Sequence, residues 1–328
     1  MTEIMRTMVE AAWKTLRTPL KRFLNLVDPP VIVLVYHRVT TLARDPELLA
    51  VTPEHFRAQM RYLKEHVPLV RFAEAGEAAN GPAVAVTFDD GYADNVLEAL
   101  PILEEVEVPA TFFVSTGTIG TARLFWWDEL DGLIMGRRDI PVEFTLQDDR
   151  FGRSWHTVTV NDRQEFYRQL VALMKMIKTE RRERWLDQLR SWGEPNGAAS
   201  SIHRAMTVPE LQQLARSRFS TIGAHSVSHS RLASLTTAAQ REEMVASKRQ
   251  LEAWLGREIE FFSYPYGRRS DYNARTAALC REAGFVKAAA NFPGQAHRWT
   301  DPYRIPRLLV RDWPVGIFAE KLGDFRTR

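Results

Sequence analysis

Four polar side chains have the types and the spacing needed to hold a metal ion and to move a proton. Asp89 and Asp90 are adjacent in the chain, and His225 and His229 are four residues apart. On one turn, that spacing lets both imidazoles reach a single ion at about 2.0–2.1 Å, as zinc sites require. With Asp90 as a third ligand, one coordination position stays open for water or substrate, which is typical of a catalytic metal.

The two acids follow an apolar run, residues 83–88, whose alternation and β-branched residues predict a short buried strand. A helix-like run begins at Val96. Because neighbouring residues at a strand end point to different sides, one acid can hold a metal while the other acts as a base. The sequence Asp-Asp-Gly also suits an ordinary turn, so the two histidines give this interpretation its weight.

The elements that would position these residues alternate between strand-like and helix-like runs. Seven strands are predicted, with helices between most of them, which indicates a mainly parallel α/β barrel. The active sites of such barrels lie at the carboxyl ends of the strands, where the paired acids and both histidines would meet. The predicted strands are residues 31–35, 83–88, 110–114, 220–223, 259–264, 285–289 and 305–311.

Between residues 119 and 204 this alternation stops. The pattern there predicts a hairpin, residues 142–146 with 156–160, and then a long helical region over residues 162–192. We therefore expect a helical and hairpin insertion, residues 119–204, within a barrel formed by residues 31–118 and 205–328.

The composition is that of a folded protein with one large domain, or with a domain that carries an insertion: 328 residues, of which 45% are apolar and 26% charged. The net charge of +3 is small, and no long basic run indicates a nucleic-acid partner. The single cysteine, Cys280, excludes an intramolecular disulfide. It lies in a predicted helix, where we expect a buried thiol.

The first segment, residues 1–30, contains a predicted amphipathic helix over residues 1–27. Charged side chains such as Arg6 and Glu10 interrupt its apolar windows, so the pattern is neither that of a signal peptide nor that of a transmembrane helix. We expect the helix to pack on its own domain, and the alternative is peripheral contact with an anionic membrane surface. The expected location is therefore cytoplasmic, with the inner membrane surface as the alternative.

Three motifs, in this order, resemble those of the polysaccharide deacetylases, the NodB-homology domain proteins of carbohydrate esterase family 4. The motifs are residues 87–91, 225–229 and 264–267, and the resemblance covers roughly residues 31–118 and 205–312. It implies an irregular (β/α)7 barrel and the removal of N- or O-acetyl groups from sugars.

The resemblance also implies a role for each polar residue. Asp89 would be the general base, and Asp90, His225 and His229 would bind a divalent metal, most often zinc, with cobalt or nickel as alternatives. Such a metal polarises the acetyl carbonyl and lowers the pKa of bound water. The backbone N–H of Tyr266 is implied to stabilise the oxyanion.

The later motifs depart from the common family pattern. Many members carry Arg just ahead of Pro-Tyr-Gly, whereas Tyr264 stands there in this chain, which resembles a Tyr-Pro-Tyr-Gly subgroup that includes poly-N-acetylglucosamine deacetylases. In the family an Arg from a later strand can pair with the base, and Arg307 is the candidate, with a surface salt bridge as the alternative. The usual Leu-x-His near the C-terminus is missing, so His37 is the expected general acid and His297 the reserve.

Five residues are candidates for substrate binding. Tyr92 and Tyr266 are expected to line the cleft, together with Pro265 and Gly267 of the third motif. Trp127 belongs to an aromatic run that could stack on a pyranose ring, although such clusters more often form core.

The expected function is metal-dependent hydrolysis of an N-acetyl group on a sugar of a glycan or of a glycan precursor. The expected partner is accordingly an N-acetylated carbohydrate or a lipid-linked sugar. Two alternatives stay open: a deformylase or other amidohydrolase on the same fold, and a catalytically silent glycan-binding protein. The missing C-terminal histidine favours the silent protein, and Asp89 counts against it, because a binding protein needs no base.

Overall fold

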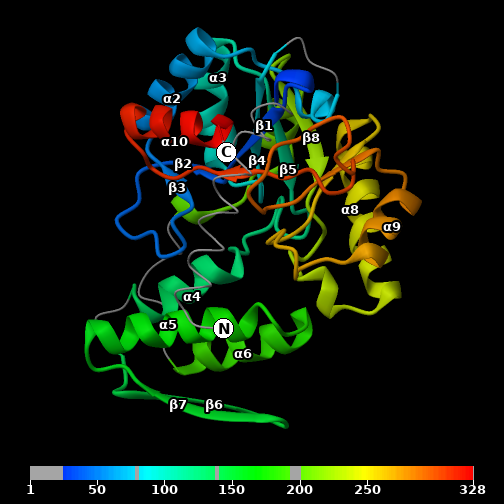
Figure 1. Cartoon of the computed structure of the whole chain (residues 1–328). Coiled ribbons are helices and arrows are strands. Elements are labelled where there is room, and N and C mark those ends of the chain that lie inside the picture. Colours follow the sequence, from blue (N-terminus) through cyan, green and yellow to red (C-terminus); the bar gives the residue numbers. More distant parts are fainter. Residues whose placement is uncertain (1–24, 78–80, 137–139, 193–200, 328) are drawn as a thin grey trace, which may run out of the picture.

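The computed structural model describes residues 25–77, 81–136, 140–192 and 201–327 (Figure 1). The amphipathic helix expected over residues 1–27 lies almost wholly outside the described residues. Only its last three residues, 25–27, are described, and they are helical. Within the described ranges, no helix combines the length and the apolar character that crossing a bilayer requires.

Seven strands form one parallel sheet in the order β10-β9-β8-β5-β4-β1-β11. All seven predicted strands are present, so the prediction of a mainly parallel α/β barrel is confirmed. Every residue of β1 and β4 is buried, as expected for strands covered on both faces. The strands are β1 (Val31–Tyr36), β4 (Ala83–Phe88), β5 (Ala110–Val114), β8 (Ser220–Ala224), β9 (Phe261–Ser263), β10 (Lys287–Ala289) and β11 (Leu308–Leu309).

The sheet curls, and a short segment near its end bonds to both edges. Ile305 bridges in parallel to Ala289 of β10, and three residues later β11 pairs in parallel with β1. The carbonyl of Ile305 also accepts a hydrogen bond from the N–H of Ala290. Arg307 lies between these two pairings, so this closing segment places it between the two edges of the sheet.

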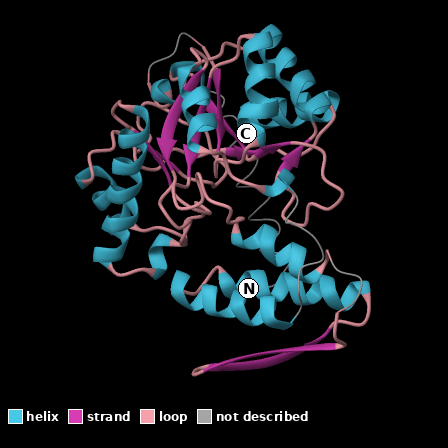
Figure 2. Ribbon diagram, turned by 180° about the vertical axis from the view of Figure 1, so that it is seen from behind, coloured by secondary structure: helices cyan, strands magenta, loops and turns pink. Residues whose placement is uncertain are grey.

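Helices surround the sheet, as the view from behind in Figure 2 shows. Their ends follow the sequence signals: Thr207 and Glu210 form a capping box at the start of α7, and Gly256 ends α8 in a left-handed conformation. The barrel helices are α2 (Pro53–His66), α3 (Leu100–Val106), α7 (Val208–Arg216), α8 (Thr237–Leu255), α9 (Ala274–Glu282) and α10 (Val315–Thr327), and shorter turns are η1 (Phe72–Glu74), the π-helical η2 (Asn95–Ala99), η3 (Ser201–His203) and η4 (Leu232–Ser234). Two further short strands, β2 (Arg38–Val39) and β3 (Ala50–Val51), pair with each other.

The residues expected to form an insertion lie together at one end of the barrel (Figure 1). They form α4 (Trp126–Ile134), the antiparallel pair β6 (Glu143–Asp148) and β7 (Phe151–His156), α5 (Val160–Met174) and α6 (Thr179–Trp192). The hairpin prediction placed the second strand over residues 156–160, which is wrong, because a tight turn starts β7 at Phe151. The predicted single helical region is two helices. The domain boundaries themselves stay a prediction.

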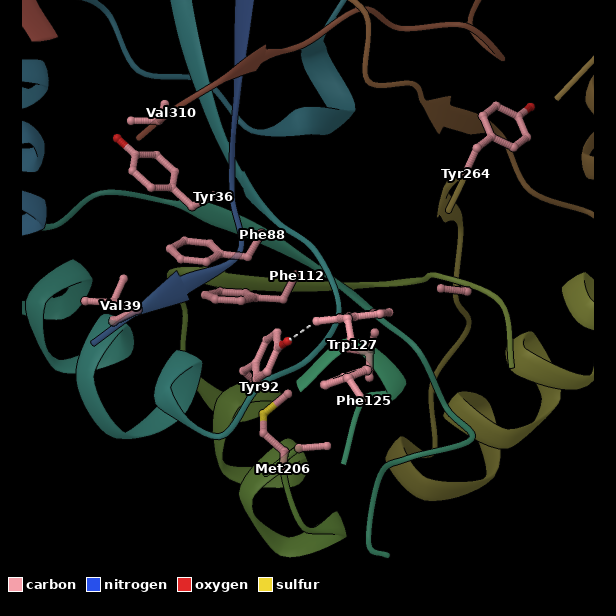
Figure 3. Close-up of a cluster of buried hydrophobic side chains, with 14 of the residues drawn as sticks. Tyr36, Val39, Phe88, Tyr92, Phe112, Phe125, Trp127, Met206, Tyr264 and Val310 are labelled. Atoms are coloured by element: carbon pink, nitrogen blue, oxygen red, sulfur yellow. Dashed lines mark hydrogen bonds between the residues drawn. The ribbon is translucent and has the colours of Figure 1, made fainter. Parts of the chain in front are cut away.

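The main core lies between the sheet and the helices that cover it. Figure 3 shows Tyr36, Phe88 and Phe112 stacked across three neighbouring strands, with ring centroids 5.5 and 4.7 Å apart. The middle ring, that of Phe88, belongs to the residue directly before Asp89. Such packing stabilises the ends of β1, β4 and β5, because buried aromatic pairs contribute about 0.5–1.5 kcal/mol beyond their buried area.

Candidate active site

The paired acids and the two histidines lie together at the carboxyl ends of two strands. Asp89 and Asp90 follow β4 directly, and His225 follows β8 directly. His229 ends the same short loop, and all four side chains are buried. The structure therefore brings together the four residues that the sequence predicted would meet.

Three of these residues present ligand atoms that all lie within 4.8 Å of one another: Asp90, His225 and His229. Oδ1 of Asp90 lies 3.2 Å from Nε2 of His229 and 3.6 Å from Nε2 of His225. This oxygen is buried and has no hydrogen-bond partner in the described part of the chain. Burial lowers the pKa of His225 and lowers that of His229 to about 3, so both imidazoles are neutral, as metal binding requires. The donor set fits a divalent metal such as zinc.

The backbone at the site adopts the left-handed conformation repeatedly, which is uncommon for residues other than glycine. The angle φ is +77° at Asp90, +63° at Ser226, +50° at His229 and +61° at Tyr266. Such conformations cost of order 1–3 kcal/mol each and persist where the surrounding contacts hold them. Their clustering indicates that the fold supports a strained backbone around the ligand atoms.

His225 is oriented by a hydrogen bond on the side away from the ligand cluster. Its Nδ1 lies 2.7 Å from the carbonyl oxygen of Ser263. Because a carbonyl can only accept, Nδ1 carries the hydrogen and Nε2 keeps its lone pair for a metal. This is the usual way in which a metal-binding histidine has its tautomer and its ring orientation fixed.

The loop that carries both histidines is held from two sides. Glu243 of α8 accepts hydrogen bonds from the backbone N–H groups of Val227 and Ser228, both at 2.9 Å. Arg182 of α6 donates to the carbonyl oxygen of Ser228 at 3.2 Å. The sequence analysis missed both Glu243 and Arg182, because each is one of several charged residues on its helix and only the fold brings it to the loop.

Asp89 forms a bidentate ion pair with Arg307 in the protein interior. Nη1 of Arg307 donates to Oδ1 at 2.8 Å and Nη2 donates to Oδ2 at 2.6 Å. The Arg307 side chain is 0% exposed, so the alternative of a surface salt bridge is wrong. Its Nε also donates to the carbonyl of Ala290, at 2.7 Å, and Nη2 donates to Oγ of Ser263, at 2.9 Å. All three guanidinium nitrogens therefore donate hydrogen bonds, and two of them bond to Asp89.

The charge of Asp89 follows from this pair. Burial on its own would raise the pKa of the carboxyl, but Arg307 outweighs it and holds that pKa well below its usual range. At Asp90, burial prevails and raises the pKa, although His37 and His225 oppose it. Asp89 is thus ionised because of Arg307. The charge of Asp90 would be stabilised by a cation bound between Asp90, His225 and His229.

The two candidates for the general acid lie at opposite ends of the barrel. His37 follows β1, and its side chain lines the same cavity as the paired acids. Burial lowers the pKa of His37, and the charges of Asp90 and Asp89 oppose that shift. His297 instead bonds through Nδ1 to the carbonyl of Asp28, at 3.1 Å, ahead of the start of β1. The reserve assignment of His297 is therefore wrong.

A cavity of about 950 Å³ opens over the ligand cluster. His37, the two acids and the two histidines lie on the barrel side of this cavity, together with Tyr266. Residues of α5, among them Tyr167 and Val171, line its other side, as do Lys175, just after that helix, and Trp127 of α4. The sequence did not predict that α5 would form this wall.

Three of the predicted substrate-binding residues do not line this cavity. Tyr92 is fully buried, and its hydroxyl donates to Oδ2 of Asp128 at 2.6 Å, so its expected place in the cleft wall is wrong. Pro265 and Gly267 shape the loop that presents Tyr266. A Cβ atom at Gly267, where φ is +66°, would lie 2.6 Å from the backbone nitrogen of Asn291. Only glycine fits there.

Comparison with known proteins identifies the family to which this chain belongs. The model of the family described as polysaccharide deacetylase matches residues 76–143 and 189–288, which is just over half of the chain. The chain belongs to the polysaccharide deacetylase family. Three of its matched positions, Asp90, His225 and His229, are the residues that form the ligand cluster.

Individual relatives are more distant. The Bacillus subtilis (strain 168) protein YxkH, named for the same family, is 29% identical over 105 residues, which is 32% of this chain and 36% of that protein. The match thus spans about a third of the length of this curated relative.

Solved structures of deacetylases share the fold at low sequence identity. A polysaccharide deacetylase from Bacillus cereus aligns with a TM-score of 0.57 and 18% identity, over 90% of this chain and 69% of its own. IcaB from Ammonifex degensii aligns with a TM-score of 0.56 and 18% identity, over 91% of this chain and 97% of its own. The Streptococcus pyogenes deacetylase PplD, solved in complex with acetate, aligns with a TM-score of 0.57 and 16% identity, over 89% of this chain and 98% of its own. At these identities the likeness establishes the fold.

Proposed function

We propose that this polysaccharide deacetylase hydrolyses the N-acetyl group of a sugar, with Asp89 as the base. The observation that carries the proposal is the buried Asp89–Arg307 pair beside the Asp90, His225 and His229 cluster, at the barrel side of one cavity. A divalent metal on these three ligands would polarise the acetyl carbonyl and lower the pKa of a water molecule. Zinc is the metal we expect, with cobalt or nickel as alternatives.

Asp89 takes the proton of the attacking water. Because Arg307 keeps this carboxylate ionised, it can accept a proton throughout the neutral range. Oδ2 of Asp89 lies 3.9 Å from Nε2 of His225, so the base lies beside the ligand cluster without joining it. The water oxygen then bonds to the acetyl carbon, the C–N bond breaks, and acetate leaves the sugar amine.

The leaving nitrogen needs a proton, and His37 is the donor that we propose. Its ring lines the cavity; burial lowers the pKa of His37, and the charges of Asp90 and Asp89 oppose that shift. The oxyanion that develops on the acetyl group is assigned to the backbone N–H of Tyr266. That N–H donates to no group in the described part of the chain, and the left-handed backbone at Tyr266 fixes its direction.

Acetate release from N-acetylglucosamine oligomers by zinc-, cobalt- or nickel-loaded protein tests this proposal. Asp89→Asn should lower kcat by about 10²–10⁴-fold while the protein still binds one metal. The matched control is Asp131→Asn, another carboxylate of the cavity, which pairs with Arg44 at 3.0 Å outside the cluster. That variant should keep kcat within about tenfold of wild type.

The same assay separates the competing functions. Faster release of formate from N-formyl sugars than of acetate from N-acetyl sugars would make the protein a deformylase. Binding of oligosaccharide and metal without release of either acid would make it a silent glycan-binding protein.

We further propose a lipid-linked sugar as substrate and a peripheral position at the cytoplasmic side of the membrane. Support comes from the amphipathic pattern of residues 1–27 and from its last two residues, Leu26 and Val27, which are 80% and 60% exposed. Flotation with anionic liposomes should recover the wild type and lose the variant that carries both Leu26→Glu and Val27→Glu. Equal recovery of the two proteins would end the membrane proposal.

A further inference from the structure

The residues expected to form an insertion, 119–204, reach the ligand cluster directly. Trp127, on α4, packs its indole against the imidazole of His229, with ring centroids 4.8 Å apart and planes at 62°. On α6, Thr179 lies within hydrogen-bond distance of two serines of the histidine loop, at 2.8 Å from Oγ of Ser230 and 3.3 Å from Oγ of Ser228. These contacts connect α4 and α6 to the loop that carries the two histidines.

The two histidines of the cluster are held in different ways. Nδ1 of His225 bonds to the carbonyl of Ser263, as metal-binding histidines usually require. Nδ1 of His229 is buried and has no hydrogen-bond partner among the residues that the structure describes. Within the described residues, no hydrogen bond to Nδ1 fixes the ring of His229, although its Nε2 faces Asp90 at 3.2 Å.

Aromatic contacts surround the ring of His229 instead. Besides Trp127, the ring of Tyr266 lies 4.7 Å away at 79°, and that of His225 lies 4.9 Å away at 65°. Tyr266 is only partly buried at the cavity and His225 is itself a ligand, whereas Trp127 is 5% exposed. Trp127 is thus the buried neighbour that can set the orientation of this ring without taking part in the cluster.

Trp127 is in turn fixed by a chain of hydrogen bonds. Its Nε1 donates to the hydroxyl of Tyr92 at 2.7 Å, shown by the dashed line in Figure 3, and that hydroxyl donates to Oδ2 of Asp128 at 2.6 Å. Oδ1 of Asp128 lies 3.3 Å from Nδ1 of His203 and 3.9 Å from Nη1 of Arg38. Arg38 also lies over the Tyr92 ring, 4.2 Å from its centroid, so the tyrosine is held on its face as well as at its hydroxyl.

We infer that Trp127, held by Tyr92 and Asp128, is a positioning residue that fixes His229 in its metal-binding orientation. The indole fixes the ring orientation of His229 by packing, whereas the Ser263 carbonyl fixes that of His225 by a hydrogen bond. The inference rests on the proposed function only in taking His229 to be a metal ligand. It gives α4 a part in the metal site, and it explains why the buried hydroxyl of Tyr92, two residues after Asp90, points toward α4 and away from the cavity.

The test is the zinc affinity of Tyr92→Phe, measured by competition with a chromogenic chelator. This change keeps the ring of Tyr92 and removes the hydroxyl that accepts from Trp127 and donates to Asp128. We expect the zinc Kd to rise about 10–100-fold, the usual cost of losing a residue that orients a metal ligand. The visible absorption of the cobalt-loaded protein should change as well, because it reports the ligand geometry and not the overall stability.

The matched control is Tyr303→Phe, which removes a buried tyrosine hydroxyl that donates to the carbonyl of Phe285 at 2.7 Å, away from the cluster. Its zinc Kd should stay within about twofold of wild type. Trp127→Leu is the second variant, and it should weaken zinc binding at least as much as Tyr92→Phe. The inference is overturned if both Tyr92→Phe and Trp127→Leu bind zinc as tightly as Tyr303→Phe with an unchanged cobalt spectrum.

The two proposals fail separately. A wild type that binds zinc tightly but releases no acetate would remove the proposed deacetylation and leave the zinc affinities of the variants to decide the role of Trp127. Equal zinc affinities in all variants, with acetate released by the wild type, would remove the role of Trp127 and leave the deacetylation in place.

Discussion

Arg307 and Asp89 are 218 positions apart in the chain and share two hydrogen bonds, of 2.8 and 2.6 Å, in the protein interior. The strands that carry them, β4 and the closing segment, are not neighbours in the sheet, since β1 lies between them. The pair therefore connects the carboxyl end of β4 with the residue just ahead of β11, across β1. A buried pair of this kind is costly to break, because the remaining partner is left as an uncompensated charge.

Replacing Arg307 should test this dependence through both stability and pH. In Arg307→Met the carboxyl of Asp89 stays buried without its cation, which should lower the free energy of unfolding by about 3–5 kcal/mol at neutral pH. In the wild type the folded-state pKa of Asp89 is lowered, so its contribution to stability is present above the unfolded pKa of about 3.9 and is lost as pH falls below that value. In Arg307→Met the pKa of Asp89 should be raised, because the effect of burial is no longer outweighed by the arginine.

The pH dependence of kcat/KM should follow the same logic. Activity that requires ionised Asp89 should fall at a higher pH in Arg307→Met than in the wild type. Arg307→Lys keeps the charge but not the two parallel hydrogen bonds, and its profile should lie between the other two. Urea unfolding at several pH values, with pH–rate profiles, gives the measurement. Identical acid limbs in all three proteins would contradict the assigned role of the pair.

Removal of the metal should lower the thermal stability reversibly. A ligand that binds only the folded state stabilises it by about 2.7 kcal/mol when present at 100 times its Kd. A chelator should therefore lower the Tm of the wild type, and zinc should restore it. His225→Ala lacks one of the three ligands, so its Tm should respond to neither treatment. A wild-type Tm that is indifferent to chelator and zinc would argue against a metal on this cluster.

The histidine loop should depend on Glu243. Glu243→Ala leaves the N–H groups of Val227 and Ser228 without their acceptor, which should cost about 1–3 kcal/mol of stability and weaken zinc binding. Glu243→Gln keeps an acceptor oxygen and should recover much of the loss. Glu242→Ala, one residue earlier on the exposed side of α8, is the control and should change neither quantity. Calorimetry and chelator competition would measure the two effects, and equal results for Glu242→Ala and Glu243→Ala would refute the prediction.

Two glycines with the same backbone conformation should respond differently to alanine. Gly256 and Gly267 both have φ of +66°, but a Cβ atom meets nothing within 4 Å at Gly256 and lies 2.6 Å from the Asn291 nitrogen at Gly267. Gly256→Ala should cost about 1–2 kcal/mol, the left-handed penalty alone. Gly267→Ala should cost more than that and also weaken activity, since the loop that presents Tyr266 must shift. Denaturation midpoints and kcat/KM of the two variants give the comparison.

The strands and the ligand cluster could be predicted from the sequence because both follow from local patterns. Apolar runs of strand length gave all seven strands, and polar residues directly after such runs must gather at one end of a parallel sheet. The pairing of Arg307 with Asp89 was expected from the family resemblance, and its burial could not be read from the residues around Arg307. A strand-end arginine looks the same in sequence whether it faces solvent or the barrel interior.

What the sequence did not reveal depends on how distant segments dock. Tyr92 follows the paired acids and was expected in the cleft, but Trp127 and Asp128 of α4 bury its hydroxyl. His297 was the reserve acid because it is the last histidine of the chain, yet its neighbour Ala296 pairs with Val31 at the start of β1, far from the carboxyl ends. The wall formed by α5 likewise depends on where the helix packs and not on its own amphipathic pattern.

The closing segment also sets the order of events during synthesis. The ribosome makes Asp89 long before Arg307, and the carboxylate has no cation of its own until residues 305–309 emerge and join β10 to β1. A nascent chain can therefore contain both histidines and Asp90 before Asp89 has its arginine. The arginine that holds Asp89 arrives with the last strand, so the site is incomplete until the barrel is shut.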